Sequence, residues 1–514
     1  MPVKRNLIAN YFGQAWRAIM SLLFVPVYIK YLGIEAYGLI GVFAMLQGWL
    51  SLLDMGMKPA LGREMGRYTG GAHNEQSIWD LLRSIEIISI VIAVLVGLII
   101  WAASGWLATD WVKAKSIPTN VSAQAFALMG FVSALQFVES LYSSTLTGLQ
   151  RQVLQNGVLS IMATVRGLGA VCVLVYVSQT IQAFFIWQCI ISVTSLLFSG
   201  VIVYKILPSP PCSARFSLRA LKDVWRFAAG IVGISLLSLL LMQVDKILLS
   251  RILSLEAFGY YSLAGVVSGA LYMLLSPVTA VYYPRFNELL ARNEDEALVK
   301  LYHQASQIVT VIVGSAAVVL ITFAEQILFL WTSNLTLTMQ VAPIMAVLAL
   351  GSFMHCLMFI PYQIQLAYGW TLLSIRINTV AVVILVPLLL WFVPIYGAIA
   401  AAWIWVSLNL WYLLIGTQFM YRRILKKEKW MWYRNDVGIP LLTASITAVL
   451  FRFIFPSLFT RLYGSLLIIT LSIVVLGVSV MAAPLLRQIA LNYLFGAIES
   501  IRLKIKIFKR GANI

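Results

Sequence analysis

Charged residues are scarce in this sequence, and acidic residues are scarcer than basic ones. Asp and Glu number 19 against 37 Lys and Arg, and all charged residues together make up 11% of the 514 residues. Average soluble domains carry about 25% charged residues. The scarcity excludes a water-soluble globule, and because hydrophobic residues reach 61%, we predict a chain that lies in a lipid bilayer.

Cysteines are also few, and they predict no disulfide framework. Three fall inside predicted membrane spans and the fourth in a predicted cytoplasmic linker, so none lies in a predicted outer loop where an oxidising compartment would pair them. They are Cys172, Cys189, Cys356 and, in the linker, Cys212. We expect no metal site and no cofactor, apart from coupling to protons or Na⁺.

Motifs that would indicate an enzyme are missing as well. The dipeptide Gly-Lys never occurs, which excludes ATP hydrolysis through a P-loop. Asp-x-Asp is absent, and the predicted outer loops are short and hold no cluster of acidic, His or Ser residues of the kind that a polymerase or ligase needs. We therefore expect a protein that is not an enzyme.

Long apolar segments are what the sequence does have, fourteen of them. A hydrocarbon core needs about 20 residues of helix, and the alternating pattern of β-barrel strands is absent. The fold class is therefore predicted as all-α and polytopic, with the first segment retained as a start-transfer helix. The predicted spans are residues 10–29, 37–57, 85–105, 121–143, 154–177, 181–204, 227–249, 260–283, 304–324, 338–361, 376–393, 397–419, 437–456 and 464–483.

The distribution of Lys and Arg predicts the orientation of these spans. With the N-terminus inside, the cytoplasmic segments hold 28 of the 37 basic residues, the outer segments hold six, and three lie within spans. Positive residues concentrate on the cytoplasmic side of membrane proteins, so we expect both termini there. The net charge of +18 is then mostly this bias, and nucleic acid is not an expected partner.

A short motif occurs twice and predicts an internal repeat. Residues 32–38 read LGIEAYG, and 221 positions later residues 253–259 read LSLEAFG. Each copy lies between two apolar segments, as the tight turn of a helical hairpin would. Repeats that meet at an interface commonly build the substrate site of a transporter, so we expect two pseudo-symmetric six-helix lobes around a central cavity.

The repeat and the composition of the connections predict the domain boundaries. The linker between the lobes is rich in proline and basic residues, and the C-terminal tail alternates basic with apolar residues, which suits either the inner-leaflet surface or a stop-transfer flank. The boundaries are 1–206 for the N-terminal lobe, 207–226 for the cytoplasmic linker, 227–420 for the C-terminal lobe, 421–484 for two extra helices, and 485–514 for the tail.

Three basic residues lie inside predicted spans: Arg17, Arg166 and Lys246. Each costs about 2.5 to 3.5 kcal/mol at a helix centre on insertion scales, which favours a function or a partner for each. Arg166 is near the middle of its span, out of reach of either interface. Such a cation in a cavity attracts an anion, and the planar guanidinium group matches phosphate in particular.

Four further ionisable residues are predicted within spans. Asp54, Asp245, Glu139 and His355 are candidates for carrying a coupling ion or for acting as counter-ions. Asp54 is placed to pair with Arg17, because the first two spans form a hairpin. For each of these residues the structural alternative is a buried pair, a span end that reaches the interface, or a histidine that is hydrogen-bonded in the core.

Several segments resemble the bacterial polysaccharide flippases, the transporters of O-antigen and exopolysaccharide. The likeness covers the first twelve spans and is carried by residues 6–14 (NLIANYFGQ), 26–38 (PVYIKYLGIEAYG), 54–56 (DMG), 245–250 (DKILLS) and 255–261 (LEAFGYY). It implies the fold of the multidrug/oligosaccharidyl-lipid/polysaccharide exporter superfamily, in which spans 1, 2, 7 and 8 line the cavity. Of the candidates on the chain, Arg17, Asp54, Asp245 and Lys246 lie on those spans.

The resemblance also implies a function. It implies an oligosaccharide on undecaprenyl pyrophosphate that is turned from the cytoplasmic to the periplasmic leaflet of the bacterial inner membrane by alternating access, for lipopolysaccharide or exopolysaccharide. The expected partners are the lipid-linked oligosaccharide and membrane lipids, with a polysaccharide polymerase and a chain-length regulator nearby. Fourteen spans resemble the peptidoglycan-precursor flippases, whose extra helix pair is thought to cradle the lipid tail.

Two other functions stay open from the sequence. A drug or cation antiporter of the same superfamily would favour acidic over basic cavity residues, and Arg166 with Lys246 weighs against it. A membrane polysaccharide polymerase would be an enzyme of another class.

Overall fold

The computed structural model describes residues 2–54, 56–69, 71, 73–208, 212–218, 221, 236, 240–454 and 461–492. Within these ranges the chain is helical and contains no β-strand, only an isolated bridge between Lys113 and Ser254. The helices of the first half are α1 (Pro2–Leu23), α2 (Val25–Leu32), α3 (Ile34–Leu50), η1 (Ser51–Asp54), α4 (Met57–Thr69), α5 (Glu75–Trp106), η2 (Leu107–Trp111), α6 (Thr119–Gly148), α7 (Gln152–Tyr176) and α8 (Ile181–Ile206).

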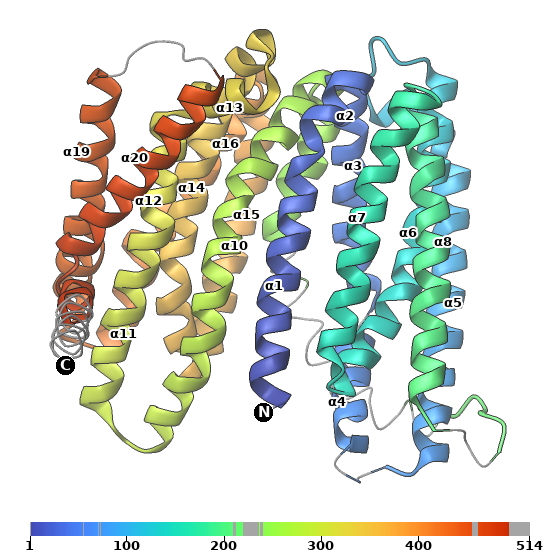
Figure 1. The fold of residues 1–514 in the computed structure, drawn as a ribbon, viewed down its shortest axis with the longest axis horizontal. Helices are drawn as coiled ribbons and strands as arrows, with labels where there is room; N and C mark the ends of the chain where they lie inside the picture. The colour runs from blue at the N-terminus through green and yellow to red at the C-terminus, as the bar shows by residue number, and fades with distance from the viewer. Residues whose placement is uncertain are drawn as a thin grey trace, which may run out of the picture. The chain divides into compact units, whose positions relative to one another are not determined.

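The second half continues in the same way (Figure 1). Its helices are α10 (Leu255–Ala291), α11 (Asp295–Val309), η3 (Thr310–Gly314), α12 (Ser315–Thr322), α13 (Ala324–Thr332), α14 (Leu335–Ala367), α15 (Thr371–Tyr396), α16 (Ala398–Trp411), η4 (Tyr412–Gly416), α17 (Thr417–Arg423), α18 (Lys429–Met431), η5 (Trp432–Gly438), α19 (Ile439–Ile454) and α20 (Arg461–Ala482).

Among the described residues, twelve helical segments are long and apolar enough to cross a membrane, and they coincide with twelve of the fourteen predicted spans. Most of the predicted span 10–29 lies in α1, which is not among the twelve, and only its last residues, 25–29, belong to one of them, Val25–Leu50. The span predicted at 227–249 and the basic tail after residue 492 lie largely outside the described residues. The prediction of an all-α, polytopic membrane fold is confirmed.

The chain divides into two compact units. Unit 1 comprises Met1–Val266 and Asn378–Ala401, and unit 2 comprises Val267–Ile377 and Ala402–Ile514. The predicted lobe boundaries stay a prediction.

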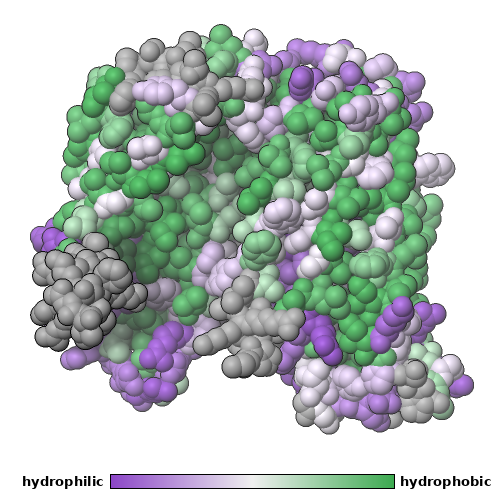
Figure 2. All heavy atoms as spheres, in the orientation of Figure 1, coloured by the Kyte–Doolittle hydropathy of each residue, from purple (hydrophilic) through white to green (hydrophobic). Residues whose placement is uncertain are grey.

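In unit 1, α5, α6 and α8 pack side by side, with α4 against α6. Their core is aliphatic and includes Leu61, Leu82, Leu141 and Val203, all of them fully buried. On the outer flank of α5 and α8, hydrophobic side chains fill the middle and hydrophilic ones gather at the ends (Figure 2). This is the distribution that a helix group with its flank in lipid requires.

Two hydrophobic cores lie in the described part of unit 2. The larger one is formed by α10, α11, α14 and η5 around Phe286, Tyr302, Phe353 and Trp432. The smaller one joins the extra helices α19 and α20 to α12, through residues such as Ala444 and Val475. The extra pair is therefore fixed to unit 2 by apolar packing, with α19 alongside α20 (Figure 1).

Both copies of the repeated motif lie in unit 1, where they are turns between helices that contact each other reciprocally. A Cβ atom at Gly38 would overlap the carbonyl oxygen of Leu255, and a Cβ atom at Gly259 would lie 2.5 Å from the carbonyl oxygen of Ile34. Ile34 corresponds to Leu255 in the repeat, and Gly38 to Gly259. The contact therefore has the two-fold reciprocity of an isologous interface.

The loop after η2 fastens these two turns. The N–H of Leu255 donates to the carbonyl oxygen of Lys113 at 3.1 Å, and the N–H of Ser116 donates to Glu35 Oε2 at 3.0 Å. One short segment thus binds the first copy through Glu35 and the second copy through Leu255.

The turn of the first copy depends on Gly33. Its backbone has φ 81° and ψ 165°, a region that is essentially restricted to glycine. We expect Gly33→Ala to destabilise the chain by about 1–3 kcal/mol without any new steric contact, since nothing lies within 4 Å of a Cβ there. The thermal midpoint of the purified protein measures this, with Gly157→Ala as the control because Gly157 also has open space but lies in a regular helix.

Candidate functional site

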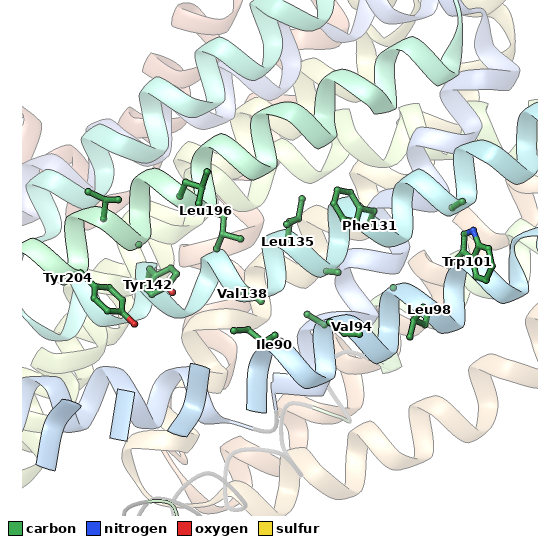
Figure 3. Close-up of a pocket in the computed structure, with 17 residues that line it drawn as sticks. Ile90, Val94, Leu98, Trp101, Phe131, Leu135, Val138, Tyr142, Leu196 and Tyr204 are labelled. Carbon is green, nitrogen blue, oxygen red and sulfur yellow. The ribbon is translucent and has the colours of Figure 1, made fainter. Parts of the chain in front are cut away.

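Two cavities of different chemistry lie in the described part of unit 1. The larger, of about 920 Å³, lies between α5, α6 and α8 and is lined by side chains such as Ile90, Leu98, Phe131 and Leu196 (Figure 3). Its lining includes Tyr142 and Tyr204, and no Asp, Glu, Lys, Arg or His among the described residues lines it. It suits hydrocarbon and offers no charge to bind an anion.

The smaller cavity, of about 450 Å³, is polar and brings together three of the predicted site residues: Arg17, Glu139 and Arg166. We call it the polar pocket. Helices α1, α2, α6, α7 and α8 all contribute to it. Its other lining residues are Met20, Ser21, Tyr28, Gln136, Ser140, Ser143, Leu159, Met162, Ala163, Gly167, Phe184, Gln188 and Ser195.

Arg166 is held in the middle of α7 by close packing of the neighbouring backbone. Gly167 lies directly against the ring of Phe24, where a Cβ would clash. The indole nitrogen of Trp187 donates to the carbonyl oxygen of Arg166 at 3.1 Å. The guanidinium Nε is buried with no hydrogen-bond partner, and within the described residues no carboxylate forms an ion pair with this side chain.

Arg17 is positioned by a ladder of polar contacts between α1 and α7. Its Nη1 donates to Asn156 Oδ1 at 3.0 Å, and Asn10 donates to Gln152 Oε1 at 2.6 Å. Trp16 extends the ladder by donating to Thr164 Oγ1 at 2.9 Å. The contact with Asn156 fixes the orientation of Arg17, and no carboxylate among the described residues pairs with its guanidinium group.

Glu139 is the acidic group of the polar pocket. It is 9% exposed and accepts a hydrogen bond from the hydroxyl of Ser195 on α8. Two guanidinium groups and one carboxylate leave the pocket with a net positive charge when all three are ionised. In surroundings of low dielectric constant, such a pocket attracts an anion.

The predicted pairing of Arg17 with Asp54 is wrong. Asp54, just beyond the apolar segment Val25–Leu50, accepts a hydrogen bond from the N–H of Lys58 at 3.0 Å and lies 3.9 Å from its ammonium group. A partner four residues away in sequence is reached more easily than one on another helix. Burial raises the pKa of the Asp54 carboxyl above its ordinary value, and the Lys58 ammonium offsets part of that rise.

The remaining predicted residues do not line the polar pocket. Asp245 accepts a hydrogen bond from the Tyr261 hydroxyl at 2.6 Å, with its other oxygen buried and unpartnered. Lys246 donates to Gln243 at 3.2 Å. His355 lies in unit 2, where Nδ1 is 2.9 Å from the Tyr272 hydroxyl. The contacts of His355 fit the structural alternative of a hydrogen-bonded core histidine.

Several pocket residues were not predicted because they are polar without being charged. Gln136 donates to Ser192 Oγ at 3.3 Å, and Gln188 and Ser195 lie on the same side of α8. The available signal was their spacing: Gln188, Ser192 and Ser195 recur at i, i+4 and i+7 of a predicted span, which places them on one helical face.

The fold and the pocket together define a class: a polytopic α-helical membrane protein with a net cationic pocket inside a helix bundle. A family model described as "Polysaccharide biosynthesis protein" matches residues 3–290. The chain belongs to this family.

Similarity to known proteins extends over most of the chain. It is 21% identical over 411 residues, 79% of this chain and 94% of the other, to a Shigella flexneri protein that is provisionally named an O-antigen transporter. The lipid II flippase MurJ in an inward closed conformation has TM-score 0.67 at 14% identity, covering 92% of this chain and 97% of MurJ.

An inward-facing multidrug resistance MATE family transporter of the MOP superfamily has TM-score 0.65 at 14% identity, covering 80% of this chain and 96% of the transporter. At these identities the two structures show the fold. The predicted fold, that of the exporter superfamily, is therefore confirmed.

Proposed function

We propose that this protein is a flippase that moves undecaprenyl-pyrophosphate-linked oligosaccharide repeat units from the cytoplasmic to the periplasmic leaflet of the bacterial inner membrane by alternating access. The family match and the provisional name of the Shigella flexneri relative support a role in surface polysaccharide biosynthesis. The exporter fold supports transport rather than glycan chemistry.

The observation that carries the proposal is the guanidinium group of Arg166 in the polar pocket, which forms no ion pair with any carboxylate in the described part of the chain. A buried charge without an ion-pair partner is costly to keep, so its retention favours an external anion as the partner. Pyrophosphate supplies several acceptor oxygens, and Arg binds such oxygens in bidentate fashion. Arg17, on the facing helix α1, would be the second ligand, and Glu139 would adjust the net charge or exchange a proton.

An antiporter of drugs or cations is the second candidate function, and the likeness to the MATE family transporter supports it. Glu139 is the one acidic group in the described lining of the polar pocket, and a cationic drug would also meet two guanidinium groups there. Charge complementarity therefore favours the anionic lipid-linked substrate.

A deletion strain distinguishes the candidates. If the protein is the flippase, surface polysaccharide is lost and lipid-linked glycan accumulates on the inner side of the membrane. Membrane-impermeant periodate then oxidises this glycan only after the inner membrane is opened. Single repeat units that periodate reaches in intact spheroplasts would instead indicate a polymerase. Unchanged polysaccharide with increased drug sensitivity would indicate the antiporter and overturn the proposal. The deletion strain that carries the wild-type gene on a plasmid is the control.

A further inference from the structure

A buried polar cluster in unit 2 joins α11 to a segment more than a hundred residues later in the sequence. His303 and Gln307 lie on α11, Glu428 lies just before α18, and Asp436 lies on η5. The side chains of His303 and Asp436 are 1% and 0% exposed, and that of Glu428 is 24% exposed. We call these four residues the His303 cluster.

Both ring nitrogens of His303 face a carboxylate. Nδ1 lies 2.5 Å from Asp436 Oδ2, and Nε2 lies 3.0 Å from Glu428 Oε2. A neutral imidazole can donate from only one of its nitrogens, whereas an imidazolium donates from both. The number of protons in the cluster therefore decides how many of these two hydrogen bonds can exist.

Gln307 fixes where the first proton lies. Its amide oxygen accepts the backbone N–H groups of Leu485 at 3.0 Å and Leu486 at 3.4 Å. Its amide nitrogen therefore donates to Asp436 Oδ1, at 2.9 Å. Asp436 is fully buried and held by this contact, so a lone pair on Nδ1 would face a carboxylate that cannot turn away. The proton of a neutral imidazole is therefore placed on Nδ1 of His303. The second proton belongs to the contact between Nε2 and Glu428.

The hydrogen bond between Nε2 of His303 and Glu428 exists only while a proton lies between them. With the proton present, Nε2 and Glu428 share a charge-assisted hydrogen bond. Without it, a ring lone pair faces a carboxylate, and Glu428 is exposed enough to turn into water. The ring of Tyr302 packs against His303, and its hydroxyl is hydrogen-bonded to that of Tyr421. Tyrosine ordinarily titrates near pH 10.

The turn that carries Glu428 is strained. Leu425 has φ 53°, an uncommon left-handed conformation for a bulky residue, and its carbonyl oxygen accepts the N–H of Glu428 at 3.1 Å. Strain of this kind persists only where surrounding contacts hold it. The bond from Glu428 to His303 is such a contact.

The cluster also fastens both ends of the extra helix pair. Asp436 lies on η5, which continues directly into α19, while Leu485 and Leu486 follow α20. We propose that the His303 cluster is a proton-binding site that latches the connection before α18 onto α11. Bound proton closes the latch, and its loss releases Glu428 and the strained turn. The latch does not depend on which substrate is carried.

The test compares trypsin cleavage at Lys426 and Lys427 in wild type and Glu428→Gln, with the full chain in lipid nanodiscs. The side-chain amide that this substitution introduces donates to a neutral Nε2, so the bond survives without the extra proton. The measured quantity is the ratio of the cleavage rate of wild type to that of this variant at the same pH. We expect this ratio to rise between pH 6 and pH 9, by at most about tenfold per pH unit for one released proton.

Glu428→Ala provides the second arm of the experiment. It removes the acceptor, so we expect rapid cleavage at every pH in that range. A constant ratio of wild type to Glu428→Gln across the pH range would overturn the proposal. Wild-type-like protection in Glu428→Ala would also overturn it, because the bond to His303 would then hold nothing in place.

Discussion

Arg166→Met is expected to abolish surface polysaccharide while the protein stays as stable as wild type. Each charge-assisted hydrogen bond to phosphate contributes about 1.5–3 kcal/mol, so losing the guanidinium group weakens substrate binding at least about tenfold. Stability behaves differently, because this side chain has no ion-pair partner among the described residues. Replacing an unpaired charge in an apolar span with Met removes a cost of about 2.5–3.5 kcal/mol.

The measurements are polysaccharide immunoblots of a complemented deletion strain and the thermal midpoint of the purified protein. Arg166→Lys keeps the charge but loses the planar fork, so it should restore part of the polysaccharide. The control is Arg83→Met, which removes a half-exposed cation that is paired with Glu86 at 3.2 Å. A normal amount of surface polysaccharide in Arg166→Met would contradict the proposal that Arg166 binds the anionic part of the substrate.

Gly38→Val and Gly259→Val are expected to have equal and large effects, because their contacts are reciprocal. Each side chain would enter the backbone of the other copy of the repeat, at Leu255 and Ile34 respectively. Overpacking typically costs about 1–3 kcal/mol, and a carbonyl oxygen cannot move aside as a flexible side chain does. We expect lower thermal midpoints and loss of surface polysaccharide in both variants.

Gly157→Val is the matched control for this pair. Gly157 lies in α7, where nothing approaches within 4 Å of a Cβ. Replacing glycine with valine there changes the helix propensity by only a few tenths of a kcal/mol. If one of the two repeat variants behaves like this control while the other is inactive, the reciprocal contact is not what keeps the two turns together.

The sequence was sufficient to predict twelve of the fourteen spans, since hydropathy over about 20 residues depends on the membrane rather than on tertiary contacts. It also identified Arg17, Glu139 and Arg166 individually, because a charge in an apolar span is conspicuous. Their meeting in one pocket was not predictable, because it depends on which faces of α1, α6 and α7 pack together.

Two failures have particular physical causes. Asp54 was matched with Arg17 through the expected hairpin, but the local partner Lys58 competes successfully for the same carboxylate. His303 was overlooked because each member of its cluster lies near a span end, where a polar side chain ordinarily reaches water. Only the fold shows that Glu428 and Asp436 come from a segment more than a hundred residues away.

The most direct test of the central claim is transport by the purified protein in vesicles. Lipid-linked oligosaccharide from the deletion strain is placed in both leaflets with wild type or Arg166→Met, and membrane-impermeant periodate measures the fraction exposed outside. We predict that wild type exposes nearly all of the glycan with time, whereas Arg166→Met exposes only the fraction that began in the outer leaflet. Equal exposure by the two proteins would contradict the claim that the polar pocket holds the pyrophosphate during transport.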